Sequence, residues 1–143
     1  MKVHHIGYAV RDIDSALECF NKLGYVCVSQ KIDELRRVRI AFIRNEETLV
    51  ELVAPNGPNS PVDEMINKNG PAPYHICYTV KDIDEQCKKL KKEGWTVIIK
   101  KSQAPAIGDA SVAFLFHKRI GIIEIVEESD WTDDTVNVFI GGG

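Results

Sequence analysis

The sequence predicts an α+β protein built from two copies of one βαβββ unit. The main observation is an internal repeat, because residues 5–14 (HIGYAVRDID) return 70 residues later as residues 75–84 (HICYTVKDID). The second observation is that each half changes from a strand-like period of two to a helix-like period and back. The third is a single glutamate inside the last aliphatic run of each half. Self-similarity at a fixed spacing indicates a duplicated structural unit.

The register of the repeat is kept over half of the chain. Residues 23–25 (LGY) match residues 93–95 (EGW) at the same spacing, and residues 50–53 (VELV) match residues 123–126 (IEIV) at a spacing of 73. The three additional residues predict a small loop insertion around residues 104–108.

Each half is expected to contain the same elements in the same order. A first strand precedes an amphipathic helix, which starts at an aspartate N-cap and ends at a glycine, and three more strands follow. The candidate N-caps are Asp12 or Asp14 and Asp82 or Asp84, and the helix-ending glycines are Gly24 and Gly94. The predicted strands are 3–10, 25–31, 36–44 and 48–54, then 74–80, 95–101, 111–117 and 121–127, with helices at about 14–23 and 84–93.

These elements predict a single domain at residues 1–127. Its two repeats occupy residues 1–54 and 74–127, and the turn-rich linker 55–73 contains a short helix at about 62–67. The C-terminal tail, residues 128–143, lies outside the repeat and is expected to form an edge strand or a mobile end.

The bulk composition argues against several classes of function. Apolar residues make up 44% and charged residues 27%, which is ordinary for a soluble globular protein. A formal charge of −3 provides no basic surface for nucleic acid. No apolar run reaches the roughly 18–20 residues that span a bilayer, and no signal peptide is recognisable. We therefore expect a cytoplasmic protein that binds neither nucleic acid nor membranes. The four cysteines (Cys19, Cys27, Cys77 and Cys87) form no CxxC pair and are expected to be small buried residues.

One face of each predicted first strand carries a histidine among small residues. The opposite face is large and apolar and should pack under the helix. The histidine face therefore suits the floor of a cavity. Its residues are His5, Gly7 and Ala9 in the first half and His75, Cys77 and Thr79 in the second.

Two other histidines are interpreted as structural or surface residues. His4 is expected on the face opposite to His5, because side chains alternate along a strand. His117 has no counterpart in the first half.

The last strand of each half carries a carboxylate, Glu51 or Glu124, within an aliphatic run. A carboxylate buried there loses solvation free energy unless a cation or a hydrogen-bond donor lies beside it. Taken singly, a strand histidine is more often hydrogen-bonded in a core, and a lone glutamate often faces water at a sheet edge. The symmetric occurrence of two imidazoles and two carboxylates instead predicts one divalent cation at a pseudo-twofold axis, with His5, Glu51, His75 and Glu124 as its ligands.

At these residues the sequence resembles the vicinal oxygen chelate (VOC) superfamily, over about residues 2–127. The markers are HIGxAV at 5–10, LGY at 23–25, VELxxP at 50–55, HIxxxVxDI at 75–83 and IE at 123–124. The resemblance implies paired βαβββ modules that form a U-shaped mixed-sheet cup around the metal, the glyoxalase/bleomycin resistance/dioxygenase fold. It also implies assembly as a homodimer.

The His/Glu/His/Glu order is similar to the ligand set of glyoxalase I-type enzymes. This implies a lyase of the lactoylglutathione lyase type, which isomerises the hemithioacetal of a small thiol conjugate by moving a proton α to a carbonyl. The cation, expected to be Ni²⁺, Co²⁺, Zn²⁺ or Mn²⁺, would act as a Lewis acid with two open positions for substrate oxygens. Glu124 is the first candidate for the base and Glu51 the second, as ligands able to loosen from the cation.

Three alternatives stay open. The segment 51–61 and Gly70 resemble the methylmalonyl-CoA epimerases, which act on an acyl-CoA, although Arg39 stands where some of them carry a glutamate base. A non-catalytic binding or resistance protein of the same fold is the second, and the presence of all four ligands argues against it. An interaction domain is the third, for which the acidic tail is a weak sign. The basic residues Arg36, Arg37, Arg39 and Lys100 are candidates for attracting an anionic conjugate or CoA phosphates, although most exposed charges are simply solvated.

Overall fold

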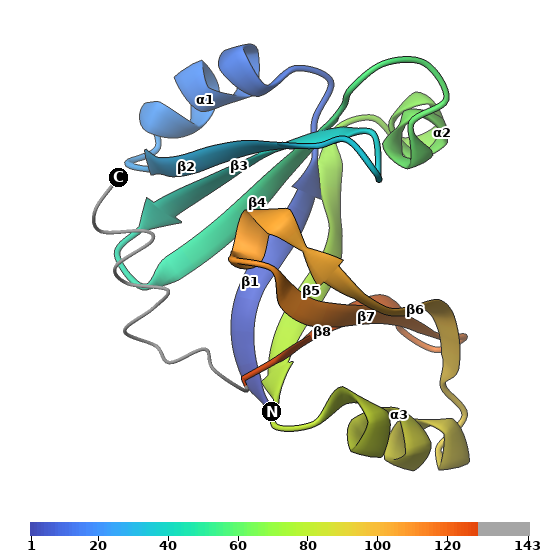
Figure 1. The fold of residues 1–143 in the computed structure, drawn as a ribbon. Coiled ribbons are helices and arrows are strands. Elements are labelled where there is room, and N and C mark those ends of the chain that lie inside the picture. The colour runs from blue at the N-terminus through green and yellow to red at the C-terminus, as the bar shows by residue number, and fades with distance from the viewer. Residues whose placement is uncertain (129–143) are drawn as a thin grey trace.

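The computed structural model describes residues 1–128, which form one curved eight-stranded sheet with helices around it (Figure 1). In chain order the elements are β1 Lys2–Ala9, α1 Ile13–Asn21, β2 Val26–Asp33, β3 Val38–Asn45, β4 Thr48–Pro55, α2 Pro61–Asn69, β5 Ala72–Val80, α3 Ile83–Lys92, β6 Thr96–Ala104, the 3-10 helix η1 Pro105–Ile107, β7 Ala110–His117 and β8 Gly121–Glu127. The predicted α+β class is confirmed, and each half has the predicted order βαβββ. The short η1 helix lies at the predicted insertion, and the strand predicted in the tail falls outside the described residues.

The strand order explains how two repeats share one sheet. It runs β2-β3-β4-β1-β5-β8-β7-β6, which reads the same from both ends when each strand is replaced by its repeat counterpart. The pairs β1–β4 and β5–β8 are parallel and the other pairs are antiparallel, so the sheet is mixed. The antiparallel β1–β5 pair joins the two halves at the centre. A pseudo-twofold axis therefore lies between β1 and β5.

The two repeated helices begin at the first of the two candidate N-caps. The Asp12 carboxylate accepts a hydrogen bond from the backbone N–H of Ser15 at 2.8 Å, and Asp82 accepts one from that of Glu85 at 3.0 Å. The hydrogen bond from Ser15 is the main reason why the pKa of Asp12 lies below its usual value. After the helices the chain turns at Gly24 and Gly94, whose φ angles of 98° and 97° favour glycine, as predicted.

Apolar side chains cover both faces of the sheet. On the outer face, one cluster packs under α1 and another under α3. Leu52 and Ile125 are repeat counterparts at the centres of these two clusters, and both are fully buried. A third cluster lies on the inner face and draws residues from both repeats, among them Ile40, Ala106 and Val112. The inner cluster belongs to neither half alone.

The expectation that all four cysteines are buried is wrong for two of them. Cys77 is buried and Cys87 is half-buried, but Cys19 and Cys27 are exposed, and all four are free thiols. Cys19 lies on the short helix α1, and Cys27 lies on the edge strand β2, where five of the eight residues are exposed.

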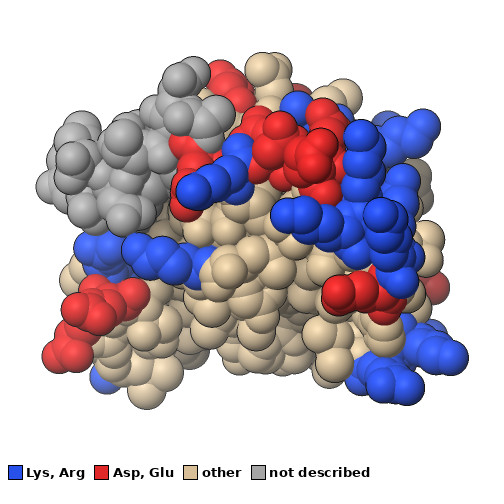
Figure 2. Space-filling model, turned by 90° about the horizontal axis from the view of Figure 1, so that it is seen from below, with Lys and Arg blue, Asp and Glu red and all other residues tan. Residues whose placement is uncertain are grey.

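The surface carries charges of both signs. Figure 2, which views the molecule from below, shows Lys and Arg side chains beside Asp and Glu around a central area of other residues. Within residues 1–128, no helix is long and apolar enough to cross a membrane.

Truncation of the buried leucine under α1 should destabilise the fold strongly. Leu52→Ala is expected to lower the free energy of unfolding by about 2–5 kcal/mol, because it removes buried methyl groups and leaves a cavity. Leu35→Ala is the matched control, since Leu35 is 85% exposed and its loss should change stability by about 0.5 kcal/mol or less. Urea unfolding in the presence of a chelator measures both, and equal effects of the two substitutions would contradict this description of the core.

Candidate metal centre

The strand register places the predicted ligands in two rows across the inner face of the sheet. In one row, Glu51 on β4 pairs with Gly7 on β1, which pairs with His75 on β5. In the other row, Glu124 on β8 pairs with Cys77 on β5, which pairs with His5 on β1. Each row therefore takes its carboxylate from one repeat and its imidazole from the other, with a small residue between them.

All four predicted side chains meet at one point and are buried. One donor atom from each of His5, Glu51, His75 and Glu124 lies within 4.8 Å of the others. The two Nε2 atoms are 3.3 Å apart, and Glu124 Oε1 lies 3.1 Å from that of His5 and 3.0 Å from that of His75. Glu51 Oε1 lies 3.5 Å and 3.7 Å from the same two atoms. The prediction that these residues share one site agrees with the geometry, and their role as ligands stays a proposal.

These distances suit a divalent cation. Donors held about 2.1 Å from a common centre lie about 3.0 Å apart at right angles and about 3.4 Å apart in a tetrahedron. Among residues 1–128, the buried Glu124 Oε1 has no hydrogen-bond partner of good geometry despite its two close nitrogens. A cation at the centre of the group would give this oxygen a partner. Two imidazoles and two carboxylates also match the preferences of Zn²⁺, Co²⁺, Ni²⁺ and Mn²⁺.

One phenylalanine ring packs against each of the two imidazoles. Phe42 on β3 contacts the ring of His5 and Phe114 on β7 contacts that of His75, each edge to face with ring centres 5.4 Å apart. Phe42 and Phe114 are repeat counterparts that pair with Glu51 and Glu124 across the sheet. The orientation of both imidazoles is thus fixed by equivalent packing in the two repeats.

The ring of His75 lies so close to the backbone of residue 7 that there is space only for glycine. A Cβ atom at position 7 would lie only 2.0 Å from Cε1 of His75, so any larger side chain would displace the imidazole. The counterpart of Gly7 is Cys77, which is fully buried beside His5. The two rows are therefore similar in plan but differ in the small residue at their centres.

The carboxylates and imidazoles strongly change one another's protonation. Burial alone would raise the pKa of Glu124, but hydrogen bonding and the charges of His5 and His75 outweigh it and hold that pKa well below its usual range. Burial alone would lower the pKa of His5, but Cys77, Glu51 and Glu124 outweigh it and raise that pKa well above its usual value. In the metal-free protein the site therefore combines an ionised Glu124 with a protonated His5.

Glu51 and Glu124 line a cavity of about 620 Å³ whose walls are mainly apolar residues from both repeats, and His5 and His75 are buried beside them. The walls include Val53 and Met65 from the first half and Ile98 and Phe114 from the second. At the rim, Arg36 forms an ion pair with the buried Asp33 at 2.8 Å and donates a hydrogen bond to Ser102 Oγ on β6 at 2.6 Å. This contact joins the two ends of the curved sheet across the opening.

Tyr74 is a cavity residue that the sequence analysis missed. It lines the cavity, and its ring lies 4.5 Å from that of His75. Burial, together with the charges of Glu51 and Glu124, raises the pKa of its hydroxyl well above the usual value. The phenol therefore keeps its proton and offers a hydrogen-bond donor to a ligand. In the sequence, the one feature that distinguished Tyr74 was its position next to His75, a predicted ligand.

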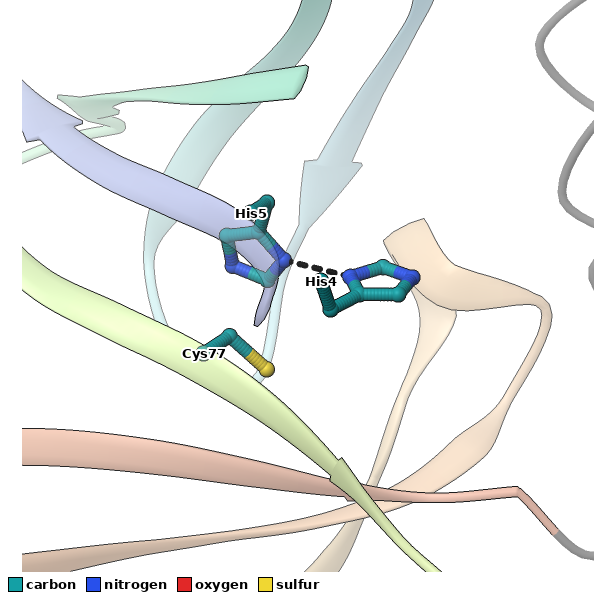
Figure 3. A group of neighbouring side chains, drawn as sticks. All are labelled: His4, His5 and Cys77. Atoms are coloured by element: carbon teal, nitrogen blue, oxygen red, sulfur yellow. Dashed lines mark hydrogen bonds between the residues drawn. The ribbon is translucent and has the colours of Figure 1, made fainter. Parts of the chain in front are cut away.

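The prediction that His4 points away from His5 is wrong. His4 Nδ1 lies 2.7 Å from His5 Nδ1 (Figure 3). The reason is a β-bulge, because Val3 pairs with Tyr78 and His5 with Cys77, so His4 is an extra residue that breaks the alternation. His117 is not among the residues that line the cavity, and its ring contacts that of Trp95 at a tilt, with ring centres 5.1 Å apart.

The basic residues divide into two groups. Arg36 and Arg37 line the cavity. Arg39 and Lys100 are exposed, and Arg39 acts on the pKa of Asp12 at the start of α1, on the outer face. The described residues of β3 that line the cavity are Val38 and Ile40, so this strand places no carboxylate there.

Comparison with known proteins gives the family. Residues 4–114 match the model of the Glyoxalase/Bleomycin resistance protein/Dioxygenase superfamily. The chain belongs to this superfamily. An ethylmalonyl-CoA/methylmalonyl-CoA epimerase of Cereibacter sphaeroides is 33% identical over 118 residues, which cover 80% of this chain and 86% of the relative. The mitochondrial methylmalonyl-CoA epimerase of Dictyostelium discoideum is 28% identical, covering 89% and 78%. The crystal structure of a methylmalonyl-CoA epimerase from Mycobacterium tuberculosis superposes with a TM-score of 0.77 at 26% identity, covering 88% of this chain and 87% of that one.

Gly7→Ala should weaken cation binding. The added methyl group would displace the His75 ring, and we expect affinity to fall by roughly 100-fold, the upper end of the loss when a ligand is no longer held in place. Isothermal titration with Co²⁺ measures the affinity. Urea unfolding of the metal-free protein is the control, because alanine is ordinarily better than glycine within a strand. Wild-type affinity in the variant would contradict the packing described here.

Cation binding should release protons and weaken at low pH. A ligand nitrogen must be unprotonated, and the raised pKa of His5 means that the metal-free site still holds a proton near neutral pH. Affinity should therefore rise as the pH increases through neutrality and fall as it decreases. Titration calorimetry in two buffers of different ionisation enthalpy reports the released protons. Identical heats in both buffers at pH 7 would contradict the prediction.

Proposed function

We propose that this protein is a metal-dependent acyl-CoA epimerase that inverts the carbon α to the thioester of a short α-alkylmalonyl-CoA. The observation that carries the proposal is the convergence of two glutamates and two histidines from two repeats, with both glutamates lining an apolar cavity. The named relatives are epimerases and indicate an enzyme, and the substrate class follows from their names. They support this alternative better than the glyoxalase I-like lyase that the ligand order first suggested.

The chemistry needs one acid and one base on opposite sides of a carbon. Glu51 and Glu124 are related by the pseudo-twofold axis and reach the cavity floor from different repeats. Each is therefore suited to face one side of the α-carbon, so that one glutamate removes the proton and the other returns one to the opposite side. A bound divalent cation would supply Lewis-acid stabilisation of the negative charge that develops on the thioester oxygen.

The base comes from this pair because the described residues that line the cavity include no other free carboxylate. Among the described residues that line the cavity, Asp33 is the only further acid, and it is engaged by Arg36 at the rim. The strand that carries Arg39 contributes apolar side chains to the cavity instead. The departure at Arg39 is thus compatible with epimerisation by Glu51 and Glu124.

The walls of the cavity favour an acyl chain over a peptide thiol. Most of the lining is aliphatic or aromatic, which suits an alkyl substituent and a thioester. Outside the glutamates, the charged lining residues described are Asp33, Arg36 and Arg37, of which Asp33 and Arg36 pair with each other. A glutathione conjugate would bring an ammonium and two carboxylates that need partners, whereas the acyl part of an α-alkylmalonyl-CoA brings one carboxylate.

Epimerase activity should be detectable with the purified, cation-loaded protein. In ²H₂O the protein should incorporate deuterium at the α-carbon of methylmalonyl-CoA or ethylmalonyl-CoA and equilibrate the two epimers, as followed by NMR. A parallel assay with methylglyoxal plus glutathione tests the glyoxalase alternative. Turnover of the hemithioacetal without deuterium exchange into either acyl-CoA would overturn the proposal.

Glu124→Gln and Glu51→Gln separate the two proton transfers. Each should lower epimerisation by about 10²–10⁴-fold, the usual contribution of a general acid or base, while deuterium exchange persists for the epimer that the other glutamate serves. Glu47→Gln is the matched control, because Glu47 is exposed in the β3–β4 turn and should leave activity unchanged. The cation content of each variant is measured alongside. Full activity in both site variants would contradict the assignment.

A further inference from the structure

His4 and His5 form a close pair at the β-bulge in β1. Their Nδ1 atoms are 2.7 Å apart, and their rings meet edge to face with centres 5.0 Å apart. His4 is half-buried and His5 is fully buried, with Cys77 on the neighbouring strand (Figure 3). The bulge is what brings both side chains to the same side, since a regular strand would separate them.

The two nitrogens of His5 have different neighbours. Nε2 faces His75 and Glu124 at the ligand cluster, whereas Nδ1 faces His4. To present a lone pair at Nε2, the neutral imidazole must carry its proton on Nδ1. His4 Nδ1 is then the acceptor of that proton. Metal-binding histidines generally use the second ring nitrogen in this way, which fixes the tautomer and the ring orientation.

The trio His4, His5 and Cys77 is less suited to hold a cation than the four predicted ligands are, although its donor atoms also lie near one another. Two nitrogen ligands of one tetrahedral ion lie about 3.4 Å apart, and the 2.7 Å between the Nδ1 atoms is a hydrogen-bond distance. The geometry favours a hydrogen bond over a second metal.

We infer that His4 is a positioning residue, which accepts the Nδ1 proton of His5 and thereby orients Nε2 toward the cation. The inference rests on the proposed metal site and deepens it. It also makes the two halves unequal, because the repeat counterpart of His4 is Tyr74, a cavity residue. Within residues 1–128, Nδ1 of His75 has no hydrogen-bond partner, so His75 is held by Gly7 and Phe114 through packing.

The pair His4→Leu and His4→Asn tests the inference. The two side chains have nearly the same shape, but only asparagine keeps an acceptor at the δ position. His4→Leu should weaken Co²⁺ or Zn²⁺ binding by about 10–100-fold, the usual effect of losing such a partner, and His4→Asn should restore most of the affinity. Competition with a chromophoric chelator measures both. Urea unfolding of the metal-free variants separates this effect from a general loss of stability.

Three results would overturn the inference. They are wild-type affinity in His4→Leu, equally weak binding in His4→Asn and His4→Leu when the metal-free stabilities agree, and a wild-type protein that binds no divalent cation. The measurement uses no acyl-CoA. A wild-type protein that binds the cation but fails to epimerise therefore refutes the proposed function, while the affinity ratio still decides the role of His4.

Discussion

The antiparallel pairing of β1 with β5 is the constraint on which the rest of this structure depends. This pairing aligns His5 with Cys77 and His75 with Gly7, so each imidazole projects over a small residue of the opposite repeat. The parallel pairs on either side then place a glutamate at the outer end of each row. A shift of one residue in the central register would move the imidazoles to the outer face, under the helices.

Burying the two carboxylates of this site costs free energy unless positive charge lies between them. Two carboxylates are buried among aliphatic residues, where desolvation disfavours ionisation. In the metal-free protein His5 supplies part of the compensation by holding a proton, because its pKa is raised whereas that of Glu124 is lowered. A divalent cation would provide more charge and would satisfy Glu124 Oε1. The same groups that stabilise the folded centre are therefore those that the proposed chemistry uses.

Much of the fold and of the candidate site could be predicted from the sequence, because the same pattern of residues occurs in both repeats. The repeat predicted the order of elements, the turning glycines and the four converging side chains. The bulges could not be predicted: strict alternation assigned His4 to the outer face, whereas an additional residue in β1 brings it to His5. Tyr74 was missed for the same reason, since it is the additional residue where β5 pairs with Gly7 and Tyr8. Exposure of Cys19 and Cys27 depends on how far the curved sheet is covered, which residue type alone does not report.

In each row of the sheet the glutamate comes from one repeat and the histidine from the other, and this has a consequence for a single βαβββ unit. One βαβββ repeat by itself carries one imidazole and one carboxylate, and these belong to different rows of the sheet. An isolated half would thus own no complete pair, and a single copy of the unit could acquire the site only by associating with its twin. Within one polypeptide the two copies need not be identical, and at one equivalent position His4 stands in the first repeat and Tyr74 in the second.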